Sequence, residues 1–456
     1  MRIVYIHQYY CNRQMPGGTR SYEMARRLAA RGHQVDVITT ERSPRRRRLA
    51  WRMTVEDGVR VHWFPVPYSN GMSYGRRIRS FAEFAGAAAV KAARLDADVV
   101  FATSTPLTVA IPGVFAAKAR RVPFVFEVRD LWPEIPIDMG ALRNPLARRI
   151  AEGLASFAYR NADEVIALSP GMAAGVQART PAARTTVVPN ASDLDLFGGS
   201  EAAGRQFRAD QHWLGDRPLV VYTGTLGIAN DAGYLVRLAA QVRDLDPEVR
   251  FLLVGDGAQF VPIRDLAARL GVLGHTLRMW RQVPKQRIPG ILAAATVATS
   301  VFLPLRSLED NSANKFFDAL AAGTPIALNY GGWQHDLIEA TGAGLALDPD
   351  DLAIAAKILA GHLRDEDWLR EAGEAARALA IGEFDRDLLF ARFESVLERA
   401  AARHRVRTSR TGGDRPATDR RATDRETTDH QATDREATDR RGTDRPDNGE
   451  VGHGTR

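Results

Sequence analysis

The stretch that decides the fold reads Asp310-Asn-Ser-Ala-Asn-Lys-Phe-Phe-Asp-Ala-Leu-Ala-Ala-Gly-Thr-Pro325. Residues 315–322 are helix formers and aromatics, and they predict a helix. Gly323 tolerates the left-handed backbone just past its end, and Pro325 prevents the helix from resuming. The apolar run Val297–Leu303 ahead of it predicts a buried strand. Strand, loop and helix start therefore form one unit, in which backbone amides can receive an anion.

Two carboxylates, Asp310 and Asp318, flank this helix start. Their spacing corresponds to a little over two helical turns, so a loop-borne Asp310 and a helix-borne Asp318 can reach opposite ends of one ligand. Carboxylates accept hydroxyl groups while amides bind phosphate, and a nucleotide sugar offers both. The structural alternative is a helix cap and a solvated first-turn charge.

Length and composition limit the class of protein. A chain of 456 residues with 45% apolar residues can build about two to four domains. The single cysteine, Cys11, excludes a disulfide framework and a multi-cysteine metal site. The first apolar run, Met1–His7, is too short for a signal peptide. Residues 99–117 lack charges, but Pro106 and Pro112 argue against a membrane span. We therefore expect a cytoplasmic protein.

Positive charge is concentrated in the first part of the chain. The formal net charge is +7, yet residues 1–200 hold 28 Lys or Arg against 17 Asp or Glu. Two clusters interleave with aromatic residues: Arg45–Arg48 near Trp51 and Arg52, and Arg76, Arg77 and Arg79 beside Phe81 and Phe84. Such clusters can dock on anionic lipid headgroups or on nucleic acid, and the alternative is a solvated loop. We expect the inner face of the plasma membrane as a partner, and no nucleic acid.

Strand-like and helical segments alternate in two series, which is typical of parallel sheets covered on both faces. The first series predicts strands at Ile3–Ile6, Gln34–Thr39, Val59–Pro65, Val99–Ala102, Phe124–Val128, Glu164–Leu168 and Thr186–Val188, with helices at Thr19–Arg31 and Pro145–Arg160. The second predicts strands at Leu219–Thr223, Phe251–Val254, Leu277–Trp280, Val297–Leu303 and Pro325–Leu328, with helices at Ala232–Asp244, Phe260–Arg269 and Pro284–Ala295. Two such units place the ligand site in the cleft between them.

These patterns predict an α/β protein with two doubly wound, Rossmann-like domains. We expect the first at residues 1–195, completed by a returning helix at 384–402, and the second at 196–383. The segment from Pro189 to about Gly215 is turn-rich and predicts the connection. From residue 408 to 456, Thr-Asp pairs recur every five residues with almost no apolar residues, which predicts a disordered tail. A functional repeat array is the alternative for this tail.

Glycine turns mark candidate ligand sites in both units. Gly17 and Gly18 precede the first helix, where the backbone can approach an anion. Gly224-Thr225 and Gly255 follow two strands of the second unit, and each could also be an ordinary tight turn. We assign these residues and Val283 to the donor site. The spacing of Gly17 and Gly18 is not that of a dinucleotide fingerprint, which argues against an NAD enzyme.

A second dense cluster follows the strand Phe124–Val128. Its charged members are Glu127, Arg129, Asp130 and Glu134. An adjacent arginine keeps Asp130 ionised, as a base or a hydroxyl-orienting group must be, although an Arg–Asp pair can also simply fix a loop. The histidines show no paired metal spacing, so we predict no metal site.

In this order the motifs resemble those of a large family, the GT-B glycosyltransferases of the GT4 type, over residues 1–402. The segments that carry the resemblance are Gly17-Gly18, Val188–Asp195, Leu253–Gly257 and the paired-acid motif at 310–323. Within the family, Arg129–Glu134 and Asn314–Gly323 resemble polysaccharide-assembly transferases, including amino-sugar transferases of the WbuB kind.

The resemblance implies roles for matching positions in the helix unit. Asp318 would accept the ribose hydroxyls of a nucleotide donor, and Asp310 would contact hydroxyls of the transferred sugar. Backbone amides from Ser312 through Asn314 to Lys315 would meet the diphosphate.

Two further roles follow from where this chain departs from the family. Many relatives carry an Arg and a Lys after the first glycine turn of the donor domain, where this chain has Thr225 and Ile228–Asn230, so we expect Lys315 to supply the cation. A group that is His in some relatives falls near Asp130, which makes Asp130 the catalytic candidate, with Glu127 and Glu134 behind it.

The implied reaction is transfer of a sugar from a nucleotide sugar to an acceptor hydroxyl, with retention at the anomeric carbon. It needs no metal and no other cofactor. A hexosamine or deoxyhexose and a lipid-linked or polysaccharide acceptor in cell-surface glycan biosynthesis are the expected substrates. Two alternatives remain: a nucleotide-sugar epimerase on the same fold, and a non-catalytic, membrane-associated protein that binds sugar or nucleic acid.

Overall fold

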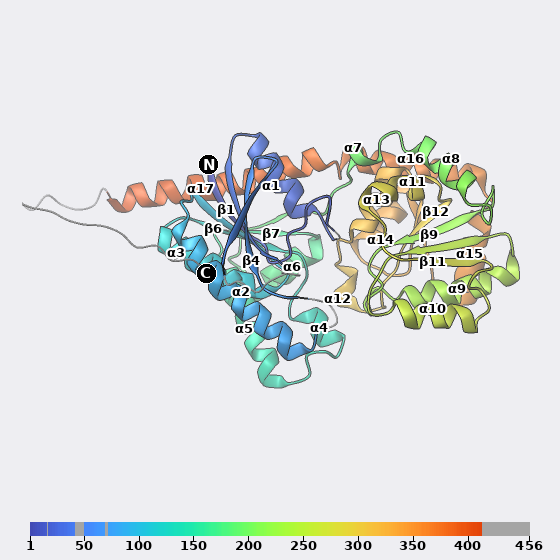
Figure 1. The fold of residues 1–456 in the computed structure, drawn as a ribbon, viewed down its shortest axis with the longest axis horizontal. Coiled ribbons are helices and arrows are strands. Elements are labelled where there is room, and N and C mark those ends of the chain that lie inside the picture. The colour runs from blue at the N-terminus through green and yellow to red at the C-terminus, as the bar shows by residue number, and fades with distance from the viewer. Residues whose placement is uncertain (16, 42–49, 69–71, 413–456) are drawn as a thin grey trace, which may run out of the picture. The chain divides into compact units, whose positions relative to one another are not determined.

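The computed structural model describes residues 1–15, 17–41, 50–68 and 72–412 (Figure 1). Two sheets organise them. The first contains β1 (Arg2–Ile6), β2 (Gln34–Glu41), β3 (Arg52–Glu56), β4 (Val59–Pro65), β5 (Val99–Thr103), β6 (Phe124–Val128), β7 (Glu164–Ala167) and β8 (Thr185–Val187). The order is β3-β4-β2-β1-β5-β6-β7-β8, and every pair is parallel except β3 with β4. We call the part built on this sheet the first half.

Helices cover both faces of the first sheet because successive side chains of its strands are apolar, so that both faces are apolar. Ile3 and Tyr5 of β1 belong to a buried cluster with residues of α1 (Arg20–Ala30) and α17 (Arg386–Gly412). Val4 and Ile6 belong to a second cluster on the opposite face. The helices of that second cluster are α2 (Tyr74–Arg94), α3 (Ala110–Arg120), α5 (Pro145–Asn161) and α6 (Pro170–Arg179), with η1 (Leu107–Val109), while the short α4 (Glu134–Asp138) lies beyond β6.

The second half repeats the design. Its sheet has the order β11-β10-β9-β12-β13-β14, all parallel, with strands β9 (Leu219–Thr223), β10 (Arg250–Val254), β11 (Leu277–Trp280), β12 (Val297–Ser300), β13 (Ile326–Leu328) and β14 (Gly344–Ala346). Its helices are α9 (Ala232–Leu245), α10 (Phe260–Arg269), α11 (Ile288–Ala293), α12 (Arg306–Glu309), α13 (Asn314–Ala322), α14 (Trp333–Thr341), α15 (Leu352–His362) and α16 (Glu366–Gly382), with η2 (Lys285–Arg287).

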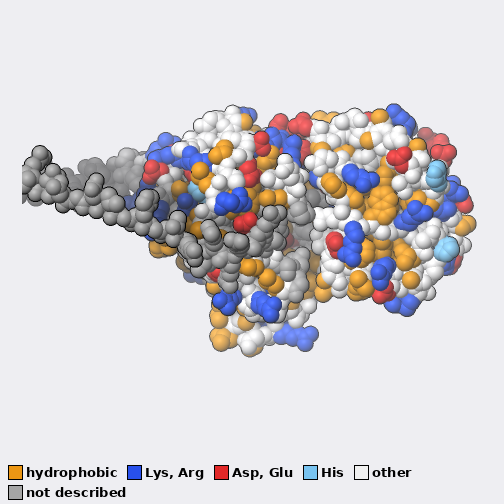
Figure 2. Space-filling view, viewed as in Figure 1, with side chains coloured by type: hydrophobic (Ala, Val, Ile, Leu, Met, Phe, Trp, Pro, Cys, Tyr) orange, Lys and Arg blue, Asp and Glu red, His pale blue; other side chains and the backbone are white. Residues whose placement is uncertain are grey.

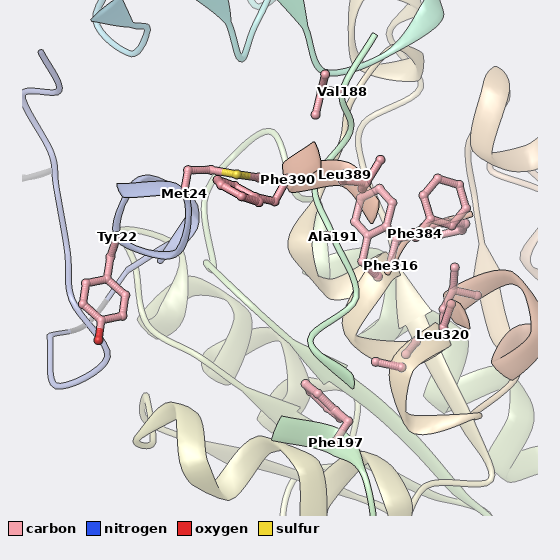
Figure 3. Close-up of a cluster of buried hydrophobic side chains, with 14 of the residues drawn as sticks. Tyr22, Met24, Val188, Ala191, Phe197, Phe316, Leu320, Phe384, Leu389 and Phe390 are labelled. Atoms are coloured by element: carbon pink, nitrogen blue, oxygen red, sulfur yellow. The ribbon is translucent and has the colours of Figure 1, made fainter. Parts of the chain in front are cut away.

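The chain passes twice between the halves, and one buried cluster continues through both passages. Residues 188–195 lead out of the first half, and α17 leads back to it; the amide of Ser192 donates to the carbonyl of Phe384 at 2.8 Å. Figure 3 shows residues of this cluster, with Met24 of α1 near Phe390 of α17 and Phe316 of α13 near Phe384. The ring of Phe384 packs 5.1 Å from that of Phe317. α17 is thereby fixed to both halves.

Several predicted elements differ from the structure for local reasons. The predicted helix Pro284–Ala295 is η2 followed by α11, because Pro289 lies in the first turn of α11 and starts a new helix. The predicted strand Val297–Leu303 ends at Ser300, because the amide of Phe302 donates to the side chain of Asn329 instead of a neighbouring strand. The turn-rich connection contains α7 (Leu194–Phe197) and α8 (Glu201–Asp210).

Some predictions fall outside the described residues, and others concern the bounds of an element or a domain. The cluster Arg45–Arg48 and residues 413–456 of the repeat tail lie outside the described residues. Residues 408–412, predicted as tail, belong to α17. The predicted domain bounds stay predictions, and the two sheets draw their strands from residues 2–187 and 219–346. In the described part of the chain, no helix combines the length and apolar character needed to cross a membrane.

Candidate active site

A cavity of about 640 Å³ lies between the two halves. Residues 13–15 and 17–19, which precede α1, form its first-half wall. The second-half wall comes from the carboxyl ends of β9 and β10, residues 282–286 and the start of α13, and Arg386 of α17 completes it. The carboxyl ends of parallel strands are where open α/β sheets bind ligands, so this cavity is the candidate active site.

Most of the predicted donor-site residues line this cavity. They are Gly17, Gly18, Gly224, Thr225, Gly255, Val283, Asn314, Lys315 and Asp318. The structure brings them together from five separate segments of the chain, and their individual roles stay predictions.

Glycines let the cavity walls come close. The backbone of Gly17 has φ +138°, which favours glycine. A Cβ at Gly255 would lie 1.8 Å from the carbonyl oxygen of Gly224, so the turns after β9 and β10 touch through their backbones. A Cβ at Gly18 would lie 3.4 Å from Nδ2 of Asn314, which places the first-half loop against the start of α13.

The N-terminus of α13 faces the cavity without a side-chain cap. Ala313 stands at the cap position in an extended conformation and has no side-chain oxygen to accept from the first-turn amides. Gly323 ends the helix with φ +66°, as its sequence predicts. Helix N-termini carry partial positive charge, and Ala313, Asn314 and Lys315 line the cavity, so an anion is favoured there.

Lys315 is a buried cation at this helix start. It is 8% exposed, and its Nζ lies 3.5 Å from the hydroxyl of Tyr222. The Nζ also lies 4.9 Å from the ring centre of Tyr222 and 4.2 Å from that of Phe302. With its amide oxygen turned toward this nitrogen, Asn230 accepts from Lys315 at 3.1 Å. Burial lowers the pKa of Lys315 to about 7, so an anion that enters the cavity would favour its charged form.

Lys285 and Asp318 form an ion pair within the cavity wall. The Nζ of Lys285 lies 2.5 Å from Oδ2 of Asp318. Asp318 is buried, whereas the Lys285 side chain is 30% exposed and lies 5.4 Å from the ring centre of Phe197. The pair holds the Asp318 carboxylate in one orientation toward the cavity.

Arg386 adds a further cation where α17 begins. It is 8% exposed, and its Nη2 lies 3.4 Å from Oδ2 of Asp193 in the connection between the halves. Its buried Nε has no hydrogen-bond partner among the described residues. Burial lowers the pKa of Arg386, and Asp193 opposes that effect. Arg386 therefore keeps one unused hydrogen-bond donor, its buried Nε–H.

Glu127 is placed differently from its prediction. It is fully buried, and its Oε1 accepts from Nη2 of Arg20 at 2.8 Å while Oε2 accepts from Thr103 at 2.6 Å. Arg20 also donates to the carbonyl oxygens of Val188 and Pro189 at 2.9 and 2.6 Å. Glu127 does not line the cavity; it anchors an arginine that fixes the connection between the halves.

Asp130 and Glu134 also lie off the cavity lining, at the carboxyl end of β6 in the first half. Asp130 is partly exposed and accepts from the hydroxyl of Thr105 at 3.0 Å. Glu134 accepts from Arg179 at 2.5 Å. Asp130 therefore stays a candidate for orienting or deprotonating the acceptor hydroxyl, and not for contacting the donor in this cavity.

The structure separates the two acids that the sequence groups as a pair. A Cβ at Gly171 would lie 1.6 Å from Oδ1 of Asp310, so Asp310 stands against the start of α6 in the first half and not in the cavity lining. α12, a short helix that the sequence did not predict, ends at Glu309, and Asp310 is the capping residue after it. Burial and neighbouring Glu309 raise the pKa of Asp310.

Ser312 also lies outside the cavity lining. Its hydroxyl accepts from the amide of Asn190 at 3.1 Å, and its carbonyl accepts from the Asn190 side chain at 2.5 Å. This residue ties the second half to the connection.

Comparison with known proteins identifies the family. Residues 17–191 match the glycosyl transferase 4-like domain, and residues 217–363 match glycosyl transferases group 1. The chain belongs to the GT4-type glycosyltransferases. The family resemblance seen in the sequence is thereby confirmed, whereas the finer resemblance to WbuB-like transferases stays a prediction.

This glycosyltransferase has named relatives. It is 24% identical over 291 residues to the GDP-mannose-dependent alpha-(1-6)-phosphatidylinositol monomannoside mannosyltransferase of Mycolicibacterium smegmatis, covering 62% of this chain and 71% of that one. It is 27% identical over 408 residues to D-inositol 3-phosphate glycosyltransferase 1 of Catenulispora acidiphila, covering 84% and 91%.

Solved structures show the fold. Sucrose-phosphate synthase from Thermosynechococcus elongatus matches with a TM-score of 0.70 at 19% identity, covering 88% of this chain and 99% of that one. Anabaena HepE in complex with UDP-glucose matches with a TM-score of 0.62 at 19% identity, covering 87% and 99%. The glycosyltransferase has the GT-B fold, as predicted.

Sequence reasoning missed Lys285, Arg386 and Arg13 of the glycosyltransferase, all of which line the cavity. Lys285 follows Val283 closely, and that proximity is the only local signal. Nothing near Arg386 marks it, because long-range packing brings the start of α17 to the cavity.

Among the described residues of the glycosyltransferase, one group could share a metal ion: His33, Glu394 and Glu398. None of the three lines the cavity. The His33 ring lies within hydrogen-bond distance of the Met1 amino group and of Glu394, at 3.0 and 2.9 Å. Independence from metal and cofactor stays a prediction.

Proposed function

We propose that this glycosyltransferase moves a hexosyl group from a nucleotide sugar to an acceptor hydroxyl, with retention at the anomeric carbon and without a metal ion. The observation that carries the proposal is that Lys315 and Arg386 line one cavity with the start of α13, beside the ion pair of Lys285 and Asp318. The diphosphate leaving group gains negative charge as the glycosidic bond breaks, and fixed cations with helix amides stabilise that charge.

The two halves divide the work in this proposal. The second half holds the nucleotide, with the turns after β9 and β10 close to its phosphates and Asp318 accepting ribose hydroxyls. The first half presents the acceptor, and Asp130 orients or deprotonates its hydroxyl. Closing the loop with Gly17 and Gly18 over the donor excludes water that would hydrolyse it.

For the substrates we propose a hexosamine or a deoxyhexose as the sugar, and a lipid-linked or polysaccharide acceptor at the cytoplasmic face of the membrane. The relative from Mycolicibacterium is named for a GDP-mannose donor and a phosphatidylinositol mannoside acceptor. The HepE structure is a complex with UDP-glucose. Both names support a hexosyl donor, and the first supports a lipid acceptor.

A donor panel tests the proposal. The enzyme is incubated with UDP-, GDP- and dTDP-sugars, with and without a prenyl-diphosphate-linked sugar, in the presence of EDTA. We expect nucleotide release only when the acceptor is present, and an anomeric configuration in the product that matches the donor by NMR. Epimer formation without acceptor, loss of activity in EDTA, or an inverted product would each contradict one part of the proposal.

A further inference from the structure

Three neighbouring helices of the first half expose large apolar side chains. α3 packs against both α2 and α5. Leu146 and Ile150 of α5 are 66% and 64% exposed, and Phe115 of α3 is 54% exposed. Exposed apolar residues are ordinary when they are scattered, but here they concentrate on adjacent helices. We call the solvent-facing surface of α2, α3 and α5 the basic-apolar face.

The exposed stripe of α5 alternates apolar and basic residues. Leu146, Arg149, Ile150, Phe157 and Arg160 are all exposed, and their successive spacings of three, one, seven and three residues keep them on one side of the helix. α5 contains one acid, which is only partly exposed and lies outside this stripe.

The neighbouring helices repeat this pattern. Their exposed members include Ile111, Phe115 and Lys118 on α3, and Ile78, Arg79 and Val90 on α2. The sequence paired the arginines of α2 with Phe81 and Phe84; Phe84 is fully buried in the core, whereas Phe81 is partly exposed. α2 also exposes two aliphatic residues, Ile78 and Val90, that the sequence did not single out.

Charge on this face is almost all positive. α2, α3 and α5 together hold ten Lys or Arg and two Asp or Glu. Within the described residues, Lys118, Arg149 and Arg160 take part in no ion pair. Figure 2 shows hydrophobic side chains next to Lys and Arg at the lower end of the first half, where Figure 1 places α2 and α5.

This combination selects one occupant. A second copy docked by the same face would set arginines against arginines, which is unfavourable. Nucleic acid would neutralise the arginines but would leave Leu146 and Ile150 against a charged backbone. An anionic bilayer surface offers phosphate groups to the arginines and an acyl boundary to the apolar side chains between them.

We propose that the basic-apolar face docks the enzyme on an anionic lipid bilayer. The inference deepens the proposed function and rests on it for the lipid-linked acceptor, since a docked enzyme would meet such an acceptor in the plane of the membrane. The docking itself can be measured without any sugar transfer, so failure of docking and failure of the proposed reaction are distinguishable.

The test is sedimentation with vesicles of phosphatidylcholine alone, and of phosphatidylcholine with phosphatidylglycerol. We expect the full chain to bind the anionic vesicles and to be released by salt. The double variant Arg149→Glu/Arg160→Glu should reduce the bound fraction at least about tenfold, because each surface arginine contributes substantially to binding. Leu146→Ser/Ile150→Ser should also weaken binding, and the loss should persist at low salt.

A matched control comes from α10 in the second half, where Val261 and Arg269 are exposed. Val261→Ser/Arg269→Glu should leave vesicle binding unchanged. All variants should keep the wild-type melting temperature and UDP or GDP affinity, because every changed side chain is exposed and outside the cavity. Absence of binding to anionic vesicles, equal binding by both α5 variants and wild type, or capture of RNA in place of vesicles would overturn the proposal.

Discussion

Lys315 and Lys285 line the same cavity but differ in what surrounds their charge. Lys315 is buried beneath two aromatic rings, has no carboxylate partner among the described residues, and has its pKa lowered to about 7 by burial. Lys285 lies 2.5 Å from Asp318, and its side chain is 30% exposed.

The difference shows how one enzyme can use two lysines for two tasks. A buried cation without a carboxylate partner gains the most stabilisation when an anion binds. Lys315 should therefore act on the diphosphate as the negative charge of the diphosphate grows. A cation that is already paired gains less from the ligand and instead fixes its partner, so Lys285 should act through Asp318. The following predictions test this division, beginning with the largest effect.

Lys315→Ala should lower kcat/KM by about 10²- to 10³-fold, because it removes a preorganised charge from the leaving-group side of the cavity. Steady-state kinetics with the active donor measures this change. Lys315→Arg should retain part of the activity. Lys357→Ala, on the exposed side of α15, is the control and should keep the wild-type kcat/KM. Near wild-type activity in Lys315→Ala would sink the proposed role.

The lowered pKa of Lys315 predicts a pH dependence of kcat/KM. We expect kcat/KM to fall by about tenfold per pH unit as pH rises above about 7, because the free enzyme then loses the charged form of Lys315. Bound diphosphate favours the charged form, so the break in kcat should lie at higher pH. In Lys315→Arg this break should disappear, since arginine stays protonated. A profile that is unchanged in this variant would assign the break to another group.

The same group sets the direction of a stability change. Because the folded-state pKa of Lys315 lies below its unfolded value, the unfolded state binds more protons between pH 7 and about 10. The free energy of unfolding should therefore rise with pH across this window, and Lys315→Met should remove the rise. Urea denaturation of both proteins at several pH values measures it, and parallel curves would contradict the prediction.

The two lysines also show what the sequence can and cannot predict. Lys315 was found because it belongs to a local unit of strand, loop and helix start, whereas Lys285 reaches Asp318 from a different strand's loop. Glu127 was assigned to the site because its own segment is dense in charge; its partner Arg20 lies in α1, and only folding reveals that pair.

The secondary-structure predictions also succeeded for some elements and failed for others. β6, β9, β11 and α10 were predicted to the residue. β3 and β14 were missed because short edge strands have a weak pattern.

Lys285→Met and Asp318→Asn should each weaken binding of UDP or GDP by about tenfold, because each breaks a charge-assisted pair that orients a ligand group. Isothermal titration calorimetry measures both. The double variant should lose less binding free energy than the sum of the two single losses, since the residues act as one unit. Additive losses would show that Lys285 contacts the ligand independently of Asp318.

Asp310→Asn should have the smallest effect, a loss of less than about threefold in kcat/KM, although the family resemblance gives this acid a sugar-binding role. Its carboxylate lies against the start of α6 and outside the cavity lining. Its pKa is raised by burial and by Glu309, so the neutral amide is a mild replacement. The comparison is with Asp318→Asn in the same assay. A loss as large as in Asp318→Asn would mean that Asp310 turns into the cavity when the donor binds, and the paired-acid interpretation would then hold for the closed enzyme.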